Sequence, residues 1–173
     1  AEPRLEAVTQ ATGWASSAVR EKIRGAELVG LIFEGPWGRD SRVVDGTPFV
    51  SMEDGTGIVH TAPGHGKEDF LVGQRNGLGV ECAVDAAGKF TAGAEPFVGE
   101  SVLTVNDKII AWLGERGRLL ASGSITHPYP HCWRCRNPVI FRATDQWFMI
   151  IDHDGHRERA LHSIDHEVRW DPP

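Results

Sequence analysis

The side chains best suited to chemistry lie in one ten-residue stretch, 60–69, which reads HTAPGHGKED. We predict a short strand at 58–62 before it, then a glycine loop, then a helix at 67–75. Backbone donors and side chains often converge where a strand meets a helix. There Asp69 could bind an ammonium group, and His60 could share a hydrogen bond with a ribose or ester oxygen. The alternative is that Asp69 only adds charge to the helix start and that His60 lies satisfied in a strand.

Two other glycine patterns do not fit nucleotide-binding loops. The run Gly64-His65-Gly66-Lys67 lacks the spacing of a phosphate-binding loop, and Glu68 stands where that loop needs a hydroxyl residue. The run Gly55-Thr56-Gly57 lacks the third glycine of a dinucleotide fingerprint. The sequence therefore predicts neither kind of site.

Cys132 and Cys135 form a C-x-x-C pair, which is half of a four-cysteine zinc site. His127 and His131 are possible further ligands, whereas Cys82 is predicted to lie in the core. Zinc binding, an unmetallated pair and a redox pair all remain open from the spacing alone.

Composition indicates a soluble globular protein with one domain and at most a small appendage. The 173 residues carry 18 Lys and Arg against 24 Asp and Glu, a net charge of −6, so binding of nucleic acid through bulk charge is disfavoured. Neither a membrane span nor a signal peptide is predicted, and three cysteines suit a reducing compartment. Because the first residue is not Met, we expect a fragment or a processed chain.

One stretch between Glu115 and Asp145 has no acidic residue and carries interleaved Tyr, Trp and Phe residues. Its arginines are Arg116, Arg118, Arg134, Arg136 and Arg142. Such a pattern could contact RNA, although an ordinary solvated face has the same composition.

The expected elements are short. Apolar spacing and glycine stops predict helices at 3–12, 17–24, 67–75 and 106–116. Alternating runs predict strands at 29–33, 42–44, 49–51 and 58–62, and a hairpin of 78–84 with 89–91. No further helix is predicted after residue 119. The fold class is therefore α+β, closer to a barrel of short strands with a few peripheral helices than to a doubly wound sheet.

Three blocks of residues carry a resemblance to a known family. They are DGTGIVHTAPGHGKEDF at 54–70, HPYPHCWRC with PVIFRATDQWF at 127–148, and VRWDP at 168–172. Together they resemble the editing domain inserted in isoleucyl-tRNA synthetases, and His60 favours the isoleucine enzymes over their valyl and leucyl relatives. The resemblance implies a partial editing domain at 1–126. It also implies a cysteine-containing return segment toward the synthetase core at 127–173.

What the resemblance implies is hydrolysis of valyl-tRNA(Ile). An isoleucine pocket cannot exclude the smaller valine by size, and isoleucyl-tRNA synthetases are the standard example of this problem. By resemblance, the catalytic residues are Asp69, which binds the substrate ammonium, and His60, which helps to exclude isoleucine. A positioned water attacks the ester, and no covalent nucleophile is expected. The implied substrate-binding residues are Gly57, Thr61, Pro63, Gly64 and His65.

The chain also departs from the family pattern. A Thr-Thr-x-Pro-Trp-Thr strand, a second C-x-x-C, and the HIGH and KMSKS signatures are all missing. We therefore expect the chain to begin inside the inserted domain and to have weak or no activity alone. The resemblance implies that editing needs no cofactor. It also implies that zinc could bind Cys132 and Cys135 in the full protein, and that ATP and magnesium are used only by the catalytic core, which is absent from this chain.

The expected partners are mischarged tRNA(Ile) and the remainder of a cytoplasmic synthetase, with no membrane and no DNA. One alternative is a valyl-tRNA synthetase editing domain acting on threonyl-tRNA. The other is a non-catalytic RNA-binding or interaction domain in which the cysteine pair is a structural knuckle.

Overall fold

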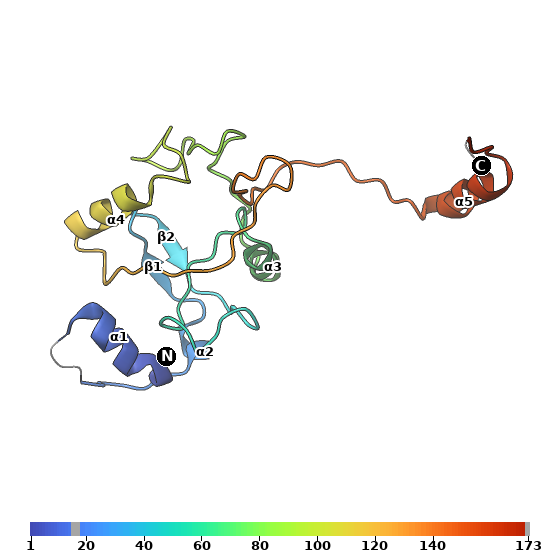
Figure 1. The fold of residues 1–173 in the computed structure, drawn as a ribbon. Helices are drawn as coiled ribbons and strands as arrows, with labels where there is room; N and C mark the ends of the chain where they lie inside the picture. The colour runs from blue at the N-terminus through green and yellow to red at the C-terminus, as the bar shows by residue number, and fades with distance from the viewer. Residues whose placement is uncertain (15–17, 172–173) are drawn as a thin grey trace. The chain divides into compact units, whose positions relative to one another are not determined.

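The computed structural model describes residues 1–14 and 18–171 (Figure 1). The chain divides into two compact units, residues 1–143 and residues 144–173. The predicted division between 126 and 127 stays a prediction.

The helices of the first unit follow the sequence signals closely. A 3₁₀ turn at Glu2–Arg4 leads into α1 at Leu5–Thr12, which ends at Gly13 with a φ of 69°. The helix α3 at Lys67–Asn76 ends at Gly77 with a φ of 64°. A residue without a Cβ adopts this left-handed conformation at little cost, which is why both glycines stop a helix. The helix α4 at Asn106–Glu115 confirms the helix predicted at 106–116. Three of the four predicted helices are therefore present.

The predicted helix at 17–24 is wrong where it can be judged. Ser17 lies outside the described residues, and 18–24 contain no helix. Val19 and Ile23 are 55% and 52% exposed, so the apolar stripe that would support a helix has nothing to pack against. A single helical turn, α2, follows at Gly25–Leu28.

The strands are fewer and shorter than predicted. The strand β1 at Ile32–Glu34 pairs antiparallel with β2 at Asp40–Arg42, with Phe33 opposite Ser41 (Figure 1). These two overlap the predicted strands at 29–33 and 42–44. The predicted strand at 49–51 is wrong, because Phe49 closes a turn by donating its N–H to the oxygen of Gly46 at 2.8 Å.

The predicted hairpin of 78–84 with 89–91 forms only beside its turn. Val84 pairs with Phe90 through an isolated antiparallel bridge, and Lys89 pairs with Ser101 through another. The side chain of Asp85 accepts main-chain N–H bonds from Ala87 and Lys89 at 2.8 and 2.9 Å, which fixes the turn.

The structure is mixed α and β, as predicted, but its strands do not close. Within 1–14 and 18–171 there are five α-helices and one open two-stranded sheet, and no barrel. The barrel expectation was based on many short strands, and 58–62 was one of them. That segment has no strand partner, and Ile58 and Val59 are 73% and 60% exposed. A strand needs a neighbouring strand to pair its backbone N–H and C=O groups. Because 58–62 has no such neighbour, it does not form a strand of the predicted barrel.

The core of the first unit is small. Its buried apolar side chains are Val72, Val84, Phe97 and Val105. Beside them, Trp112 of α4 stacks on Trp37 with ring centroids 5.4 Å apart, and it meets Phe97 edge to face at 5.8 Å. Aromatic contacts of this kind add about 0.5–1.5 kcal/mol each to area burial.

The second unit is an extended segment followed by a helix that was not predicted from the sequence. A short 3₁₀ turn at His153–Gly155 leads into α5 at His156–His166. The signal was present, because Ala160, Leu161 and Ile164 fall at helical spacing after Gly155. No helix in the described part of the chain is long and apolar enough to cross a lipid bilayer.

Candidate functional site

Asp69 is held at the beginning of α3. Gly66 caps the helix and Asp69 is its third residue. A Cβ placed on Gly66 would lie 2.6 Å from Oδ2 of Asp69, so the carboxylate folds back over the glycine loop. Its side chain is half-buried and makes no hydrogen bond or ion pair with the described residues. A helix N-terminus favours a negative charge. The helix start therefore favours the charged form of the Asp69 carboxylate, which remains available to bind a cation.

The glycine loop is wedged between α3 and the chain near residue 81. Pro63 packs on Gly73 of α3, where an added Cβ would lie 2.7 Å from Cγ of the proline. Gly64 is buried, and an added Cβ there would overlap the main-chain oxygen of Glu81. Both glycines are therefore required by close approach, which fixes the loop relative to the helix that carries Asp69.

A segment far along the chain, 141–143, closes the other side of the loop. The N–H of Ala143 donates to the oxygen of Gly64 at 2.7 Å, and Nδ1 of His65 lies 3.1 Å from the oxygen of Phe141. The Arg142 side chain donates through Nε to the oxygen of Val84 at 2.9 Å. His65 therefore positions the loop in this structure.

The far end of α3 is anchored as well. Arg75 donates to the oxygen of Thr47 at 2.8 Å, and Arg42 donates to the oxygen of Asn76 at 2.6 Å. Asp45 lies in the loop that Arg75 contacts. The main-chain N–H of Thr47, and to a lesser extent its hydroxyl, lower the pKa of Asp45, and the charge of Arg75 lowers it further. These contacts hold the helix at its C-terminus while the glycine loop holds its start.

The remaining predicted site residues are placed less firmly. His60 is exposed, and its ring makes no contact with a hydrogen-bonding or aromatic group in the described part of the chain. Thr61 is half-buried, and Gly57 has a φ of 82°. Pro63, Gly64, His65 and Asp69 are thus brought together around the glycine loop. No hydrogen bond between described residues ties His60 to Asp69.

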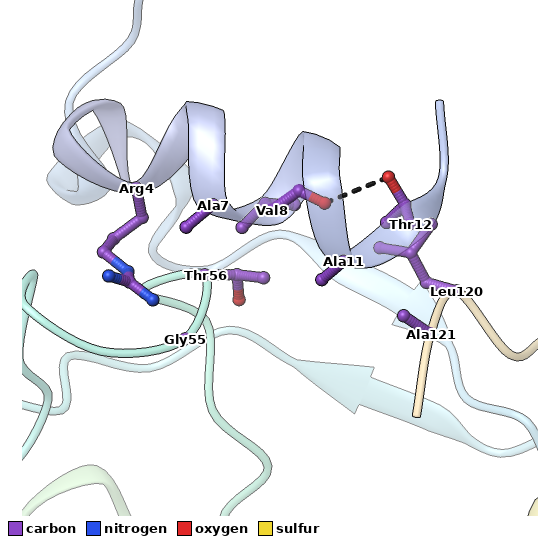
Figure 2. Close-up of a pocket in the computed structure, with 9 residues that line it drawn as sticks. All are labelled: Arg4, Ala7, Val8, Ala11, Thr12, Gly55, Thr56, Leu120 and Ala121. Carbon is purple, nitrogen blue, oxygen red and sulfur yellow. Dashed lines mark hydrogen bonds between the residues drawn. The ribbon is translucent and has the colours of Figure 1, made fainter. Parts of the chain in front are cut away.

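A separate hollow of about 340 Å³, which no motif in the sequence predicts, lies beside α1 (Figure 2). Its lining residues are Arg4, Ala7, Val8, Ala11, Thr12, Gly55, Thr56, Leu120 and Ala121. Figure 2 shows the Arg4 side chain reaching from the start of the helix toward Gly55, and its Nε is buried without a hydrogen-bond partner among the described residues. Neither His60 nor Asp69 lines this hollow.

The cysteine pair lies in a tight turn. The N–H of Cys132 donates to the oxygen of Asn137 at 2.8 Å, and the N–H of Arg136 donates back to the oxygen of Cys132 at 2.9 Å. The main-chain N–H of Cys135 and then that of Arg134 lower the pKa of the Cys132 thiol, and the Cys135 thiol adds to the effect. Hydrogen bonds to the thiolate favour the charged form, which is the metal ligand and the nucleophile.

Other ligands do not gather around these cysteines. The rings of His127 and His131 bond to nearby main-chain oxygens, those of Pro128 and Tyr129. Across the residues that the structure describes, no three His, Cys, Asp or Glu side chains form a group that could hold a metal ion. The pair therefore fits half of a tetrahedral zinc site.

Several arginines of the stretch proposed to contact RNA already have protein partners. Arg116 stacks over Trp112 at 4.2 Å, Arg118 pairs with Glu34 at 3.1 Å, and Arg134 stacks over Trp133 at 4.9 Å. An RNA contact by this stretch stays a prediction.

Comparison with known proteins gives one consistent result. No family model matches the chain. It is 49% identical over 169 residues to an isoleucine–tRNA ligase of Syntrophomonas wolfei, and the match covers 97% of the chain. It is 47% identical over 171 residues to that of Thermotoga neapolitana and 44% identical over 173 residues to that of Desulfovibrio desulfuricans. The chain is similar to a segment of isoleucine–tRNA ligases.

The matched segment is 18% of the length of each of these isoleucine–tRNA ligases. The match covers 97–99% of the chain, so it includes the glycine loop, α3 and the cysteine pair. The likeness to isoleucine–tRNA ligases therefore extends through the residues around which the candidate site is built.

Proposed function

We propose that this chain is the part of an isoleucyl-tRNA synthetase that carries the editing site, and that its substrate is valyl-tRNA(Ile). The observation that supports this most directly is the Asp69 carboxylate. It lies at the start of α3 over the glycine loop, half-buried and without a hydrogen-bonding or ionic partner among the described residues. The motif around it belongs to a stretch similar to isoleucine–tRNA ligases.

The proposed reaction is hydrolysis of the ester that joins valine to the terminal ribose. Asp69 receives the α-ammonium group of the amino acid, and a charge-assisted hydrogen bond of this kind contributes about 1.5–3 kcal/mol. A water molecule attacks the ester carbonyl, the bond to the ribose oxygen breaks, and that oxygen takes a proton. Positioning and electrostatic stabilisation supply the acceleration, so neither a covalent nucleophile nor a cofactor is needed.

His60 supplies the discrimination in this proposal. It is placed beside the terminal ribose and the amino-acid side chain, where its ring leaves room for valine and excludes the additional methylene of isoleucine. Gly57, Thr61, Pro63, Gly64 and His65 form the rest of the binding surface. Two of these are fixed by packing before substrate arrives: Pro63 packs on Gly73 of α3, and Gly64 packs on the main-chain oxygen of Glu81.

The remainder of a longer synthetase is the proposed partner of this chain. Trp147, Phe148, Met149 and Ile150 are consecutive apolar residues between 77% and 102% exposed. A continuous apolar run is typical of a strand that is buried on both faces, so we propose that further parts of the synthetase cover it. ATP, magnesium and isoleucine attachment belong to that remainder, which acts in the cytoplasm on tRNA(Ile).

We propose that Cys132 and Cys135 bind zinc only together with ligands from other residues. Two thiolates provide half of a tetrahedral donor set, and the turn lowers the pKa of the Cys132 thiol. In a complete site the metal would fix the turn between 132 and 137. It takes no part in the proposed hydrolysis.

The test uses the whole synthetase, because the chain spans 18% of its relatives. Asp69→Asn removes the charge and keeps the size. It should lower kcat/KM for valyl-tRNA(Ile) deacylation by about tenfold to a hundredfold, because one charge-assisted hydrogen bond is lost. Glu68→Gln is the matched control, one residue earlier in the same helix and exposed, and it should leave the rate unchanged.

Unaltered deacylation in Asp69→Asn would remove Asp69 from the proposed role. Equal losses in Asp69→Asn and Glu68→Gln would mean that helix charge, and not ammonium recognition, matters. Binding of valyl-tRNA(Ile) without turnover by the unmutated synthetase would favour the non-catalytic RNA-binding alternative. Turnover of threonyl-tRNA in preference to valyl-tRNA would favour a valine-enzyme editing domain.

A further inference from the structure

Two histidines of α5 lie side by side on the helix surface. His162 and His166 are four residues apart, and their ring centroids are separated by 4.6 Å with planes inclined at 56°. Both are exposed, and neither ring has a hydrogen bond to another described residue. The nitrogens of both imidazoles are therefore open to a ligand from solution.

Neutral imidazole is a preferred ligand of the later first-row divalent metals, Ni²⁺, Cu²⁺ and Zn²⁺. Two histidines at i and i+4 lie on one helix face and can reach a single ion. We propose that His162 and His166 form a two-histidine chelate for such an ion. No third His, Cys, Asp or Glu of the described residues joins the pair, so water completes the coordination.

The chelating face is distinct from the apolar side of α5. The apolar stripe is formed by Leu161 and Ile164, which are 52% and 44% exposed. At 3.6 residues per turn, His162 and His166 lie roughly 150° around the helix from that stripe. A protein surface that covers Leu161 and Ile164 would therefore leave both imidazoles accessible to a metal ion.

Charges around the pair do not oppose a cation. Glu158 lies four residues before His162, and Asp165 lies three residues after it, so at helical spacing both carboxylates neighbour that histidine. The nearest cation on this face, Arg159, is turned toward the start of the helix. Its Nη1 donates to the oxygen of Asp154 and lies 4.0 Å from the Asp154 carboxylate.

Metal binding should stabilise the helix that presents the histidines. α5 has 11 residues, and isolated helices of that length are marginal in water. The two imidazoles reach one ion only when the segment is helical, so binding favours the helical form by mass action. The chelate thus predicts a structural readout that is independent of any enzymatic activity.

The experiment titrates Ni²⁺ into the 173-residue chain carrying Cys132→Ser and Cys135→Ser, which removes the competing thiols. Calorimetry measures affinity, and far-ultraviolet circular dichroism follows helix content. In this background the chain should bind one Ni²⁺ and gain helix. His162→Gln with His166→Gln should weaken binding on the order of a hundredfold, because two linked ligands act as a chelate.

Two controls keep the test specific. His153→Gln with His156→Gln removes the same number of histidines from the same unit, and it should change the affinity by less than about threefold, because it leaves the chelate intact. His166→Glu with Glu167→His keeps the composition and changes the spacing to five, which places the imidazoles on different faces and should abolish the chelate. The proposal is overturned by undetectable Ni²⁺ binding, by equal losses in the two glutamine pairs, or by unchanged affinity after the spacing change.

Discussion

Nδ1 of His65 lies 3.1 Å from the main-chain oxygen of Phe141, so two segments 76 residues apart meet at the glycine loop. A carbonyl oxygen only accepts, so Nδ1 carries the hydrogen in this contact. The N–H of Ala143 adds a second bond, to the oxygen of Gly64 at 2.7 Å. The loop that precedes Asp69 is therefore held from outside its own helix, which is the support that a preorganised binding site needs.

Replacing His65 should loosen the segment that closes the loop. His65→Ala removes one hydrogen bond worth about 1 kcal/mol, so amide hydrogen exchange at Ala143 should accelerate about fivefold. His131→Ala is the control, because its ring bonds to Tyr129, two residues away. Unchanged exchange at Ala143 in His65→Ala would show that the 141–143 segment is held without this contact.

Gly64→Ala should destabilise the first unit. The added Cβ would overlap the Glu81 oxygen and lie 2.9 Å from its carbonyl carbon, and main-chain atoms cannot move aside as a side chain does. We expect a loss of about 1–3 kcal/mol in the free energy of unfolding, measured by urea denaturation. Gly79→Ala meets no atom within 4 Å and should be neutral or slightly stabilising. Equal midpoints for the two variants would contradict the close approach at Gly64.

The sequence was most informative where structure is locally determined. The helices α1, α3 and α4 were predicted to within about two residues, because apolar spacing and a terminal glycine act within one or two turns. The same local signals existed at 156–166 but were missed, since proline breaks at 128, 130 and 138 favoured a strand and loop interpretation of the whole C-terminal part.

Strands and the site's supports were less predictable, because they depend on distant partners. The pattern of 58–62 fits a strand, but pairing decides whether it forms one, and no pairing is found there in the described structure. Likewise, the motif indicated Gly64 and His65, yet nothing in it points to Glu81, Phe141 or Ala143 as their neighbours. Long-range packing of this kind has no periodic signature in a single sequence.

The Cys132 thiol should titrate with a pKa below that of an ordinary cysteine. Main-chain N–H groups stabilise the thiolate, so more of it exists near neutral pH and alkylation is faster there. Site-resolved mass spectrometry of iodoacetamide labelling across pH should give a half-maximal rate for Cys132 at a lower pH than for an unperturbed cysteine thiol. Cys135→Ser should shift that midpoint upward in part, because the thiol contact is lost and the main-chain bonds remain. A midpoint at or above that of an unperturbed cysteine thiol would contradict the described turn.

Zinc should remain well below one equivalent per chain after gel filtration. Cys132 and Cys135 supply two of the four ligands of a structural site, and no larger ligand group forms among residues 1–14 and 18–171. Atomic absorption should show the content rising when a second C-x-x-C segment of a longer synthetase is supplied. Stoichiometric zinc in the chain as it stands would mean that other ligands, such as His127 or His131, complete the site.

His60→Ala should change which product the synthetase destroys. The ring is exposed and makes no hydrogen bond within the described residues, so its removal should cost little stability. If the ring excludes the larger substrate, the smaller alanine should admit it, and isoleucyl-tRNA(Ile) should then be deacylated while valyl-tRNA(Ile) still is. His127→Ala, which replaces an exposed histidine outside the glycine loop, should keep isoleucyl-tRNA(Ile) intact. Protection of isoleucyl-tRNA(Ile) in both variants would leave His60 without a part in discrimination, because the extra space at position 60 would then have no effect on substrate choice.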